Sequence, residues 1–211
     1  MARFHLVDHP LLRRELTVLR DRRTRPPAFR AALRRASLLL AAEAARSLRT
    51  RAVPVATPLA AARGAALTAP VVLVPILRAG LGFVEGFLEL LPDATVGHLG
   101  IYRDEVTLEP VEYYARLPRS LGDASVFVLD PMLATGGSAC AAIGALRARG
   151  ARSVVLVSLV AAPEGVRAVR RAHPATTLIT AALDRRLNRH GYIVPGLGDA
   201  GDRLFATGGA A

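Results

Sequence analysis

The sequence predicts an α/β protein built on a doubly wound, mostly parallel sheet flanked by helices. Two observations support this class. Short apolar runs bounded by turn residues, such as 125–129, are typical of strands buried on both faces of a parallel sheet. These runs alternate with segments of helical periodicity, which predicts parallel strands joined by right-handed crossovers. The chain of 211 residues suits one domain covering 1–211.

The expected elements follow the chain in order. Apolar residues at helical spacing predict two N-terminal helices, at 11–25 and 29–51, within the segment 10–50. The core is expected at 70–182, and the charged connection at 104–110 is expected to form a flexible β-flap. The other expected elements are strands at 52–58, 71–74, 125–129, 153–160 and 176–181, helices at 83–91, 138–149 and 164–172, and extended segments at 95–103 and 111–117.

The composition favours a folded, cytoplasmic protein. Hydrophobic residues make up 52% of the chain and charged residues 21%, which is unlike a disordered chain. The longest apolar stretches, such as 69–77, are shorter than the roughly 18 to 20 residues that span a bilayer. The first ten residues lack the apolar core of a secretory signal, and a single Cys140 cannot form an internal disulfide.

The formal net charge of +11 raises the question of an anionic partner. All 28 basic residues are Arg, and many lie in the two predicted N-terminal helices between apolar positions. Solvated helix faces explain them most simply. An RNA surface is the alternative, and its binding would weaken steeply with added salt.

The nine residues DPMLATGGS, at 130–138, follow a predicted strand and precede a predicted helix. Free N–H groups and the helix dipole favour an anion at such a helix start. Thr135 and Ser138 offer hydroxyl donors, while Gly136 and Gly137 let the backbone approach a phosphate. Asp130 can accept hydrogen bonds from sugar hydroxyls. The loop therefore suits a ribose phosphate, although an ordinary capped helix start has the same residues.

The loop also resembles the phosphoribosyl pyrophosphate signature of the type I phosphoribosyltransferases. It lacks the Lys of a GxxxxGK[ST] loop and does not match GxGxxG. Three further stretches look like the uracil phosphoribosyltransferase family: VPILRAGLG at 74–82, YRDEVTLEPVEYY at 102–114 and GYIVPGLGDAGDR at 191–203. The resemblance covers nearly the whole chain, and it implies the type I fold with a small base-binding hood formed by 184–207.

The resemblance implies a transferase that joins uracil to phosphoribosyl pyrophosphate (PRPP), giving UMP and diphosphate in pyrimidine salvage. It assigns no catalytic residue. The uracil ligands that it implies are the backbone of Ile193, Gly198, Asp199 and Ala200. The PRPP ligands that it implies are Arg78, Arg103, Asp130, Pro131, Met132, Leu133, Ala134, Thr135, Gly136, Gly137, Ser138 and Asp199.

The implied cofactor is Mg²⁺ carried by PRPP, with no direct metal site on the protein. Many phosphoribosyltransferases have two adjacent acids at this strand end, whereas the second position here is Pro131, as in the uracil family. Some family members are activated by GTP, and members form homodimers or larger assemblies. One departure from the family pattern is Ala206, where Gly is usual.

Two alternatives stay open. One is a phosphoribosyltransferase for another base, such as a purine, against which the 191–203 motif argues. The other is an RNA-binding regulator on the same fold, since fold alone does not establish function. A membrane partner is not expected, and a nucleic-acid partner is not favoured.

Overall fold

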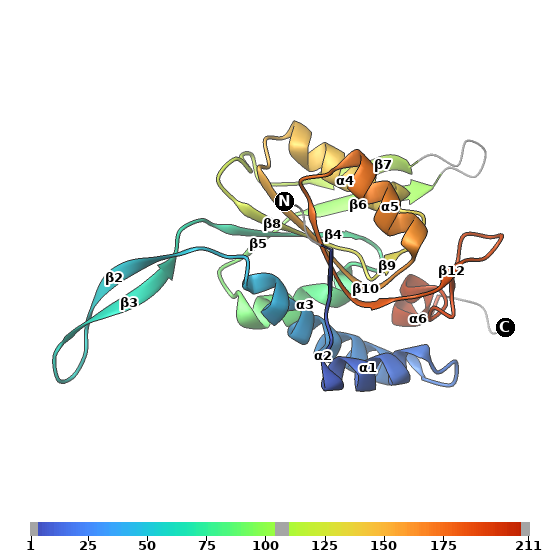
Figure 1. Ribbon diagram of the computed structural model, residues 1–211, viewed down its shortest axis with the longest axis horizontal. Coiled ribbons are helices and arrows are strands. Elements are labelled where there is room, and N and C mark those ends of the chain that lie inside the picture. Colours follow the sequence, from blue (N-terminus) through green and yellow to red (C-terminus); the bar gives the residue numbers. More distant parts are fainter. Residues whose placement is uncertain (1–3, 104–109, 208–211) are drawn as a thin grey trace.

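The structure is a computed structural model that describes residues 4–103 and 110–207. A nine-stranded sheet forms its centre (Figure 1). All neighbouring strands are parallel except the pair β6 and β7. The spatial order is β1 (Phe4–Leu6), β11 (Thr177–Leu183), β10 (Ser153–Ala161), β8 (Ser125–Leu129), β4 (Val71–Leu77), β6 (His98–Arg103) and β7 (Pro110–Arg116); β5 (Thr95–Val96) pairs with β4, and β9 (Met132–Leu133) pairs with β10. The predicted mostly parallel sheet is confirmed.

The strand register explains why the central runs are apolar throughout. Val126 of β8 lies between Val72 of β4 and Val154 of β10, and all three side chains are buried on one face. The next residue, Phe127, lies between Leu73 and Val155 on the opposite face. Because successive strand residues point to opposite faces, a sheet covered on both sides needs apolar residues at every position.

Helices cover the two faces as Figure 1 shows. On one face lie α1 (Pro10–Arg20), α2 (Pro26–Ala45) and α3 (Leu81–Leu90), whose buried side chains join the core cluster of Phe127. On the other face lie α4 (Gly137–Ala148) and α5 (Pro163–Ala172). Both faces are therefore closed, as the doubly wound class requires.

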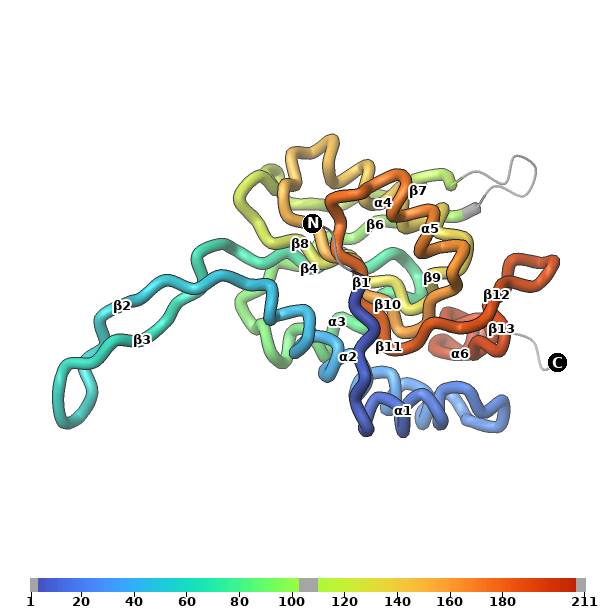
Figure 2. Tube along the Cα trace, in the orientation of Figure 1, coloured from blue at the N-terminus to red at the C-terminus, as the bar shows by residue number. Residues whose placement is uncertain are grey.

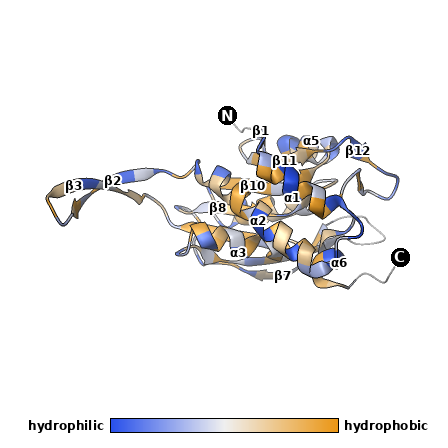
Figure 3. Cartoon of the chain, turned by 90° about the horizontal axis from the view of Figure 1, so that it is seen from below, coloured by the Kyte–Doolittle hydropathy of each residue, from blue (hydrophilic) through white to orange (hydrophobic). Residues whose placement is uncertain are grey.

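The two N-terminal helices are shorter than the predicted 11–25 and 29–51. His9 caps α1 by accepting the Leu11 N–H at 3.1 Å, and α1 ends at Arg20. Pro26 occupies the first turn of α2, where a backbone N–H would have no partner within the helix, so its absence costs no hydrogen bond. The turn before Pro26 separates the two helices. Figure 3 views the molecule from this side and shows hydrophilic and hydrophobic residues interspersed along both helices.

An antiparallel hairpin, β2 (Thr50–Ala56) and β3 (Ala61–Leu67), forms a separate sheet that stands out from the body (Figures 1 and 2). The predicted strand at 52–58 corresponds to β2. Its partner was not predicted, because the Ala-rich segment lacks the alternation of a half-buried strand. Strand β1 was not predicted either, since three residues at the sheet edge carry too little pattern.

The C-terminal segment, residues 184–207, forms the hood. It contains the antiparallel pair β12 (Arg186–Leu187) and β13 (Ile193–Val194), followed by the short helix α6 (Ala200–Phe205). The predicted flap at 104–110 lies outside the described residues, except that Pro110 begins β7. None of the helices in the described ranges combines the length and apolar composition that a membrane crossing requires.

Candidate active site

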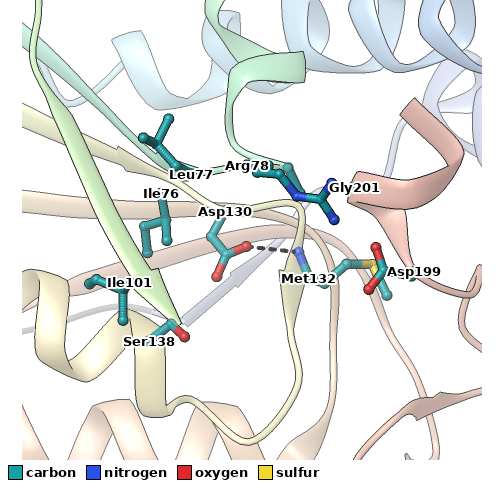
Figure 4. Close-up of a pocket in the computed structure, with 10 residues that line it drawn as sticks. Ile76, Leu77, Arg78, Ile101, Asp130, Met132, Ser138, Asp199 and Gly201 are labelled. Carbon is teal, nitrogen blue, oxygen red and sulfur yellow. Dashed lines mark hydrogen bonds between the residues drawn. The ribbon is translucent and has the colours of Figure 1, made fainter. Parts of the chain in front are cut away.

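A cleft of about 240 Å³ lies at the carboxyl ends of β4, β6 and β8. This is the edge of a parallel sheet at which ligands usually bind. Figure 4 shows the cleft with Asp130 near its centre and Asp199 contributed by the hood. Its lining residues are Ile76, Leu77, Arg78, Ala79, Ile101, Asp130, Met132, Ser138, Asp199 and Gly201.

The segment 130–138 forms a strand-turn-helix connection as predicted from its sequence. Gly136 is the N-cap of α4 with φ of 86°, a left-handed conformation that favours glycine. Its carbonyl accepts the N–H of Cys140 at 2.8 Å, the first bond of the helix. Ser138, in the first turn, lines the cleft. The free N–H groups of this turn make it suited to hold a phosphate.

Helix α5 supports this loop from behind. A Cβ atom on Gly165 would lie 2.5 Å from the carbonyl oxygen of Ala134 and 2.8 Å from that of Leu133. A Cβ atom on Gly136 would in turn lie 3.0 Å from the Gly165 carbonyl oxygen. The two glycines therefore allow the helix and the loop to touch through their backbones.

Asp130 follows β8 directly and is partly buried. Its N–H donates to the Val157 carbonyl at 3.1 Å, and its Oδ1 accepts the Met132 N–H at 3.4 Å. Burial raises the pKa of the Asp130 carboxyl to about 7, and the Met132 N–H offsets only part of this effect. Near neutral pH the carboxyl therefore exists in both protonation states, and its ionised form accepts hydrogen bonds only.

Arg78 follows β4 and reaches the hood. Its Nη2 donates to Asp202 Oδ1 at 2.9 Å, and its Nη1 donates to Thr207 Oγ1 at 3.1 Å. Thr207 also donates to Asp202 at 2.8 Å. These bonds, first that of Thr207 and then that of Arg78, lower the pKa of the Asp202 carboxyl. Just over half of the Arg78 side chain, 53%, stays exposed, so the guanidinium can still bind an anion.

The hood presents Asp199 to the cleft. Asp199 is the N-cap of α6, and its Oδ1 accepts the Asp202 N–H at 2.9 Å. A Cβ atom on the next residue but one, Gly201, would lie 3.3 Å from that oxygen. Ile193 and Ala200 are buried, whereas Gly198 is exposed with φ of 79°.

The family model described as uracil phosphoribosyltransferase matches residues 6–207. The chain belongs to the uracil phosphoribosyltransferase family. A relative named uracil phosphoribosyltransferase from Symbiobacterium thermophilum is 52% identical over 98% of this chain and 100% of its own length. One of the same name from Geobacillus kaustophilus is 51% identical with the same coverage.

Solved structures share the fold of this chain. The AQ2163 protein from Aquifex aeolicus has a TM-score of 0.93 with 38% identity, over 99% of this chain and 100% of that one. A hypoxanthine phosphoribosyltransferase from Staphylococcus aureus has a TM-score of 0.51 with 14% identity, over 74% of each chain. That second likeness shows the shared type I phosphoribosyltransferase fold alone.

The cleft brings together five of the residues that the family resemblance singled out: Arg78, Asp130, Met132, Ser138 and Asp199. The rest of 131–137 forms the loop around it without lining it. Ile193, Gly198 and Ala200 belong to the hood but do not line this cleft. Arg103 ends β6, and the position of its side chain lies outside what the structure describes.

Five lining residues were not singled out from the sequence: Ile76, Leu77, Ala79, Ile101 and Gly201. Ile76, Leu77 and Ala79 fall inside the VPILRAGLG motif and Gly201 inside the GDAGDR motif, so the family motifs carried a signal for them. Ile101 had none, since nothing in its predicted strand separates it from other apolar positions. Asp202, the partner of Arg78, was also missed.

A phosphoribosyltransferase of this family is expected to receive Mg²⁺ together with its substrate. In the described ranges no cluster of three His, Cys, Asp or Glu side chains could hold a metal ion. Among the residues that the structure describes, two carboxylates line the cleft, Asp130 and Asp199. Carboxylate oxygens suit Mg²⁺, which usually keeps several waters and binds substrate phosphates. Asp130 and Asp199 are therefore chemically compatible with Mg²⁺ that is also bound by substrate phosphates.

Proposed function

We propose that the protein transfers the phosphoribosyl group of PRPP to N1 of uracil, forming UMP and diphosphate. The observation that carries this proposal is one cleft lined both by the phosphate loop, through Asp130 and Ser138, and by the hood, through Asp199 and Gly201. Family membership supports the same reaction. UMP salvage is the corresponding role.

The sugar phosphate is assigned to the loop 130–138. Its 5′-phosphate would bind the free N–H groups at the start of α4 with the hydroxyls of Thr135 and Ser138. Asp130, at the end of β8, would accept hydrogen bonds from the ribose hydroxyls. The close contact between Gly165 and the loop backbone supports a fixed geometry for both interactions.

The diphosphate is assigned to Arg78, with Arg103 and Asp199 as further ligands of PRPP. A guanidinium offers a fixed charge and a planar fork of donors to phosphate oxygens. Mg²⁺ bound with PRPP would neutralise charge on the diphosphate. The exposed half of Arg78 supports this role, because its existing bonds to Asp202 and Thr207 hold the side chain without burying it.

Uracil is assigned to the hood backbone at Ile193 and at Gly198, Asp199 and Ala200. Uracil presents N–H donors and carbonyl acceptors, and main-chain groups at fixed positions can match that pattern. Cytosine has a different pattern and would leave buried groups unpaired, which costs affinity. The base therefore enters between the hood and the sugar.

The reaction forms the bond from uracil N1 to ribose C1 and breaks the bond from C1 to the diphosphate oxygen. The electron pair of the broken bond leaves with diphosphate, and the N1 proton passes to solvent water. No residue of the cleft is assigned as a base. Catalysis rests on holding the two reactants in line and on charge stabilisation of the leaving group.

The finer expectations are proposals as well: a homodimer or larger homo-oligomer, activation by GTP, and a cytoplasmic location. The exposed β2–β3 hairpin supports association of copies, because an isolated two-stranded hairpin is marginally stable in water. Light scattering of the purified chain tests the first of these proposals. The hairpin-deleted chain is the comparison.

UMP formation tests the function directly. Purified protein is incubated with PRPP, Mg²⁺ and uracil, beside matched reactions with cytosine, hypoxanthine and orotate, each with and without GTP. Turnover restricted to uracil is expected. Turnover of hypoxanthine would favour the purine alternative, and no turnover with any base would contradict the proposal.

A further inference from the structure

We infer that Arg20 and Asp184 are positioning residues for base recognition, because together they bind both backbone groups of Gly196. The inference rests on the proposed function, in which the hood backbone reads uracil. Neither side chain lines the cleft. They act through the turn 195–198, which connects the two stretches of backbone assigned to the base.

The geometry is that of an ion pair that bonds the N–H and the carbonyl of the same residue, Gly196. Arg20, the last residue of α1, donates to both oxygens of Asp184, at 2.8 and 2.7 Å. The N–H of Gly196 donates to Asp184 Oδ2 at 2.8 Å, and Arg20 Nη1 donates to the Gly196 carbonyl at 2.9 Å. Gly196 thus has no backbone group left free to move independently of the pair.

The ion pair is shielded from water, which strengthens its hold on the turn. The Asp184 side chain is 7% exposed and that of Arg20 is 26% exposed. Removing one member of such a buried pair leaves the other charge without a partner. Loss of Arg20 would also leave the Gly196 carbonyl without this donor, and loss of the Asp184 carboxylate would leave the buried Gly196 N–H without its acceptor.

The turn itself transmits this constraint to Ile193. Gly196 has φ of 59°, and a Cβ atom on it would lie 2.2 Å from the Ile193 carbonyl oxygen. The chain therefore folds back onto the residue that is proposed to bind uracil. We therefore expect a shift of Gly196 to disturb the nearby Ile193 carbonyl.

Arg203 anchors the neighbouring peptide to the same end of α1. It donates to the Leu197 carbonyl at 2.8 Å and to the Asp21 carbonyl at 2.7 Å, and it also bonds the Leu19 carbonyl. Its guanidinium lies 4.5 Å from the centre of the Phe29 ring. Arg20 from α1 and Arg203 from α6 thus hold residues 196 and 197 against the end of α1 and the turn that follows it.

Different elements therefore hold the two parts of the site. The phosphate loop is held by the sheet and α5, whereas the base-reading turn is held by the N-terminal helices. Loosening the ion pair should therefore impair uracil recognition while leaving the PRPP ligands of the phosphate loop 130–138 in place. If the ion pair had a purely structural role, its loss would instead weaken the binding of uracil and of PRPP alike, or would only lower the stability of the fold.

The test compares Arg20→Met with Arg13→Met, the same change on the same helix at a side chain that is 71% exposed. Arg20→Met is expected to raise KM for uracil by about tenfold, as the loss of an ordered hydrogen-bond geometry predicts, with KM for PRPP changed less than about twofold. The preference for uracil over cytosine should fall. Arg13→Met should leave all three quantities unchanged.

Asp184→Asn is the second variant, in case Arg20→Met does not fold. Asn keeps an oxygen for the Gly196 N–H but loses the charge that holds Arg20, so a smaller rise in KM for uracil is expected. Circular dichroism monitors the fold of each variant. Equal changes in both KM values, or no change in either variant, would overturn the inference.

The wild-type reaction separates this inference from the proposed function. If the wild-type protein does not convert uracil, the proposed function fails and takes the inference with it. If the wild type converts uracil and the variants behave like Arg13→Met, the function stands and only the positioning role is refuted.

Discussion

Arg78 and Asp202 form an ion pair at the cleft, with Nη2 of the arginine 2.9 Å from Oδ1 of the aspartate. The pair joins the end of β4 to α6 of the hood, so an assigned diphosphate ligand is held by the part of the chain that is assigned to the base. Thr207 bonds both members. The position of Arg78 therefore depends on its contacts with the hood.

Replacing Arg78 with Lys should raise KM for PRPP by about tenfold, because an ammonium lacks the planar fork that binds phosphate oxygens and cannot reproduce both hood contacts. Steady-state kinetics with both substrates varied measure this change. Arg149→Lys, at a pair with Glu112 on the surface, is the matched control and should leave KM unchanged. Equal PRPP affinity in the two variants would contradict the assignment.

The ionisation of Asp130 should control the use of PRPP. Burial raises the pKa of its carboxyl to about 7, and the ionised form is the better acceptor for ribose hydroxyls. We expect kcat/KM for PRPP to rise with pH through a midpoint near 7. Asp130→Asn should have low activity without this rise, whereas Asp93→Asn, at an exposed turn, should keep the wild-type profile. A pH profile shared by all three proteins would assign the titration to PRPP itself.

The same pKa predicts a cost in stability. The unfolded chain loses the Asp130 proton near 3.8, whereas the folded protein keeps it up to about 7. Between these values the free energy of unfolding falls as the pH rises, because the folded state binds the extra proton. Asp130→Asn should therefore be more stable than wild type at pH 8, and the difference in Tm should shrink toward zero near pH 4. A difference that grows on acidification would contradict this account.

Gly165→Ala should separate α5 from the phosphate loop. Its methyl group would lie 2.5 Å from the Ala134 carbonyl oxygen, so helix or loop must shift. We expect a loss of about 1 to 3 kcal/mol in the free energy of unfolding and a raised KM for PRPP. Urea unfolding and kinetics measure the two effects.

Gly144→Ala in α4 is the control for this substitution. The nearest atom to its methyl group would be His173 Cε1 at 3.9 Å, an ordinary contact. This variant should gain about 0.5 to 1 kcal/mol from helix propensity and keep wild-type kinetics. A Gly165→Ala protein with the stability and kinetics of Gly144→Ala would show that the close approach is unimportant.

Ala206→Gly should stabilise the hood. Ala206 ends α6 with φ of 57°, a left-handed conformation that costs roughly 1 kcal/mol for a residue with a Cβ atom. Glycine removes this cost, so the free energy of unfolding should rise by about 1 kcal/mol. Ala148→Gly, at the last helical residue of α4, is the opposite case and should lower it. Urea unfolding of both variants decides whether backbone conformation sets the sign.

The sequence alone predicted the alternating strands and helices and the mostly parallel sheet. The reason is that a strand buried on both faces must be apolar at every position, as in β8 and β10, and that pattern is local. It also located the loop 130–138, because a strand end, glycines and hydroxyl residues lie together in the chain. The family motifs pointed to Arg78 and Asp199 for the same cleft.

Only the tertiary structure decided which distant residues meet. Arg20 and Asp184 lie 164 positions apart, and no spacing rule connects them. The contacts between Arg78 and Asp202 and between Gly165 and the phosphate loop are of the same kind. Local sequence patterns indicate burial and backbone conformation. These distant contacts instead depend on how the hood and the N-terminal helices pack against the edge of the sheet.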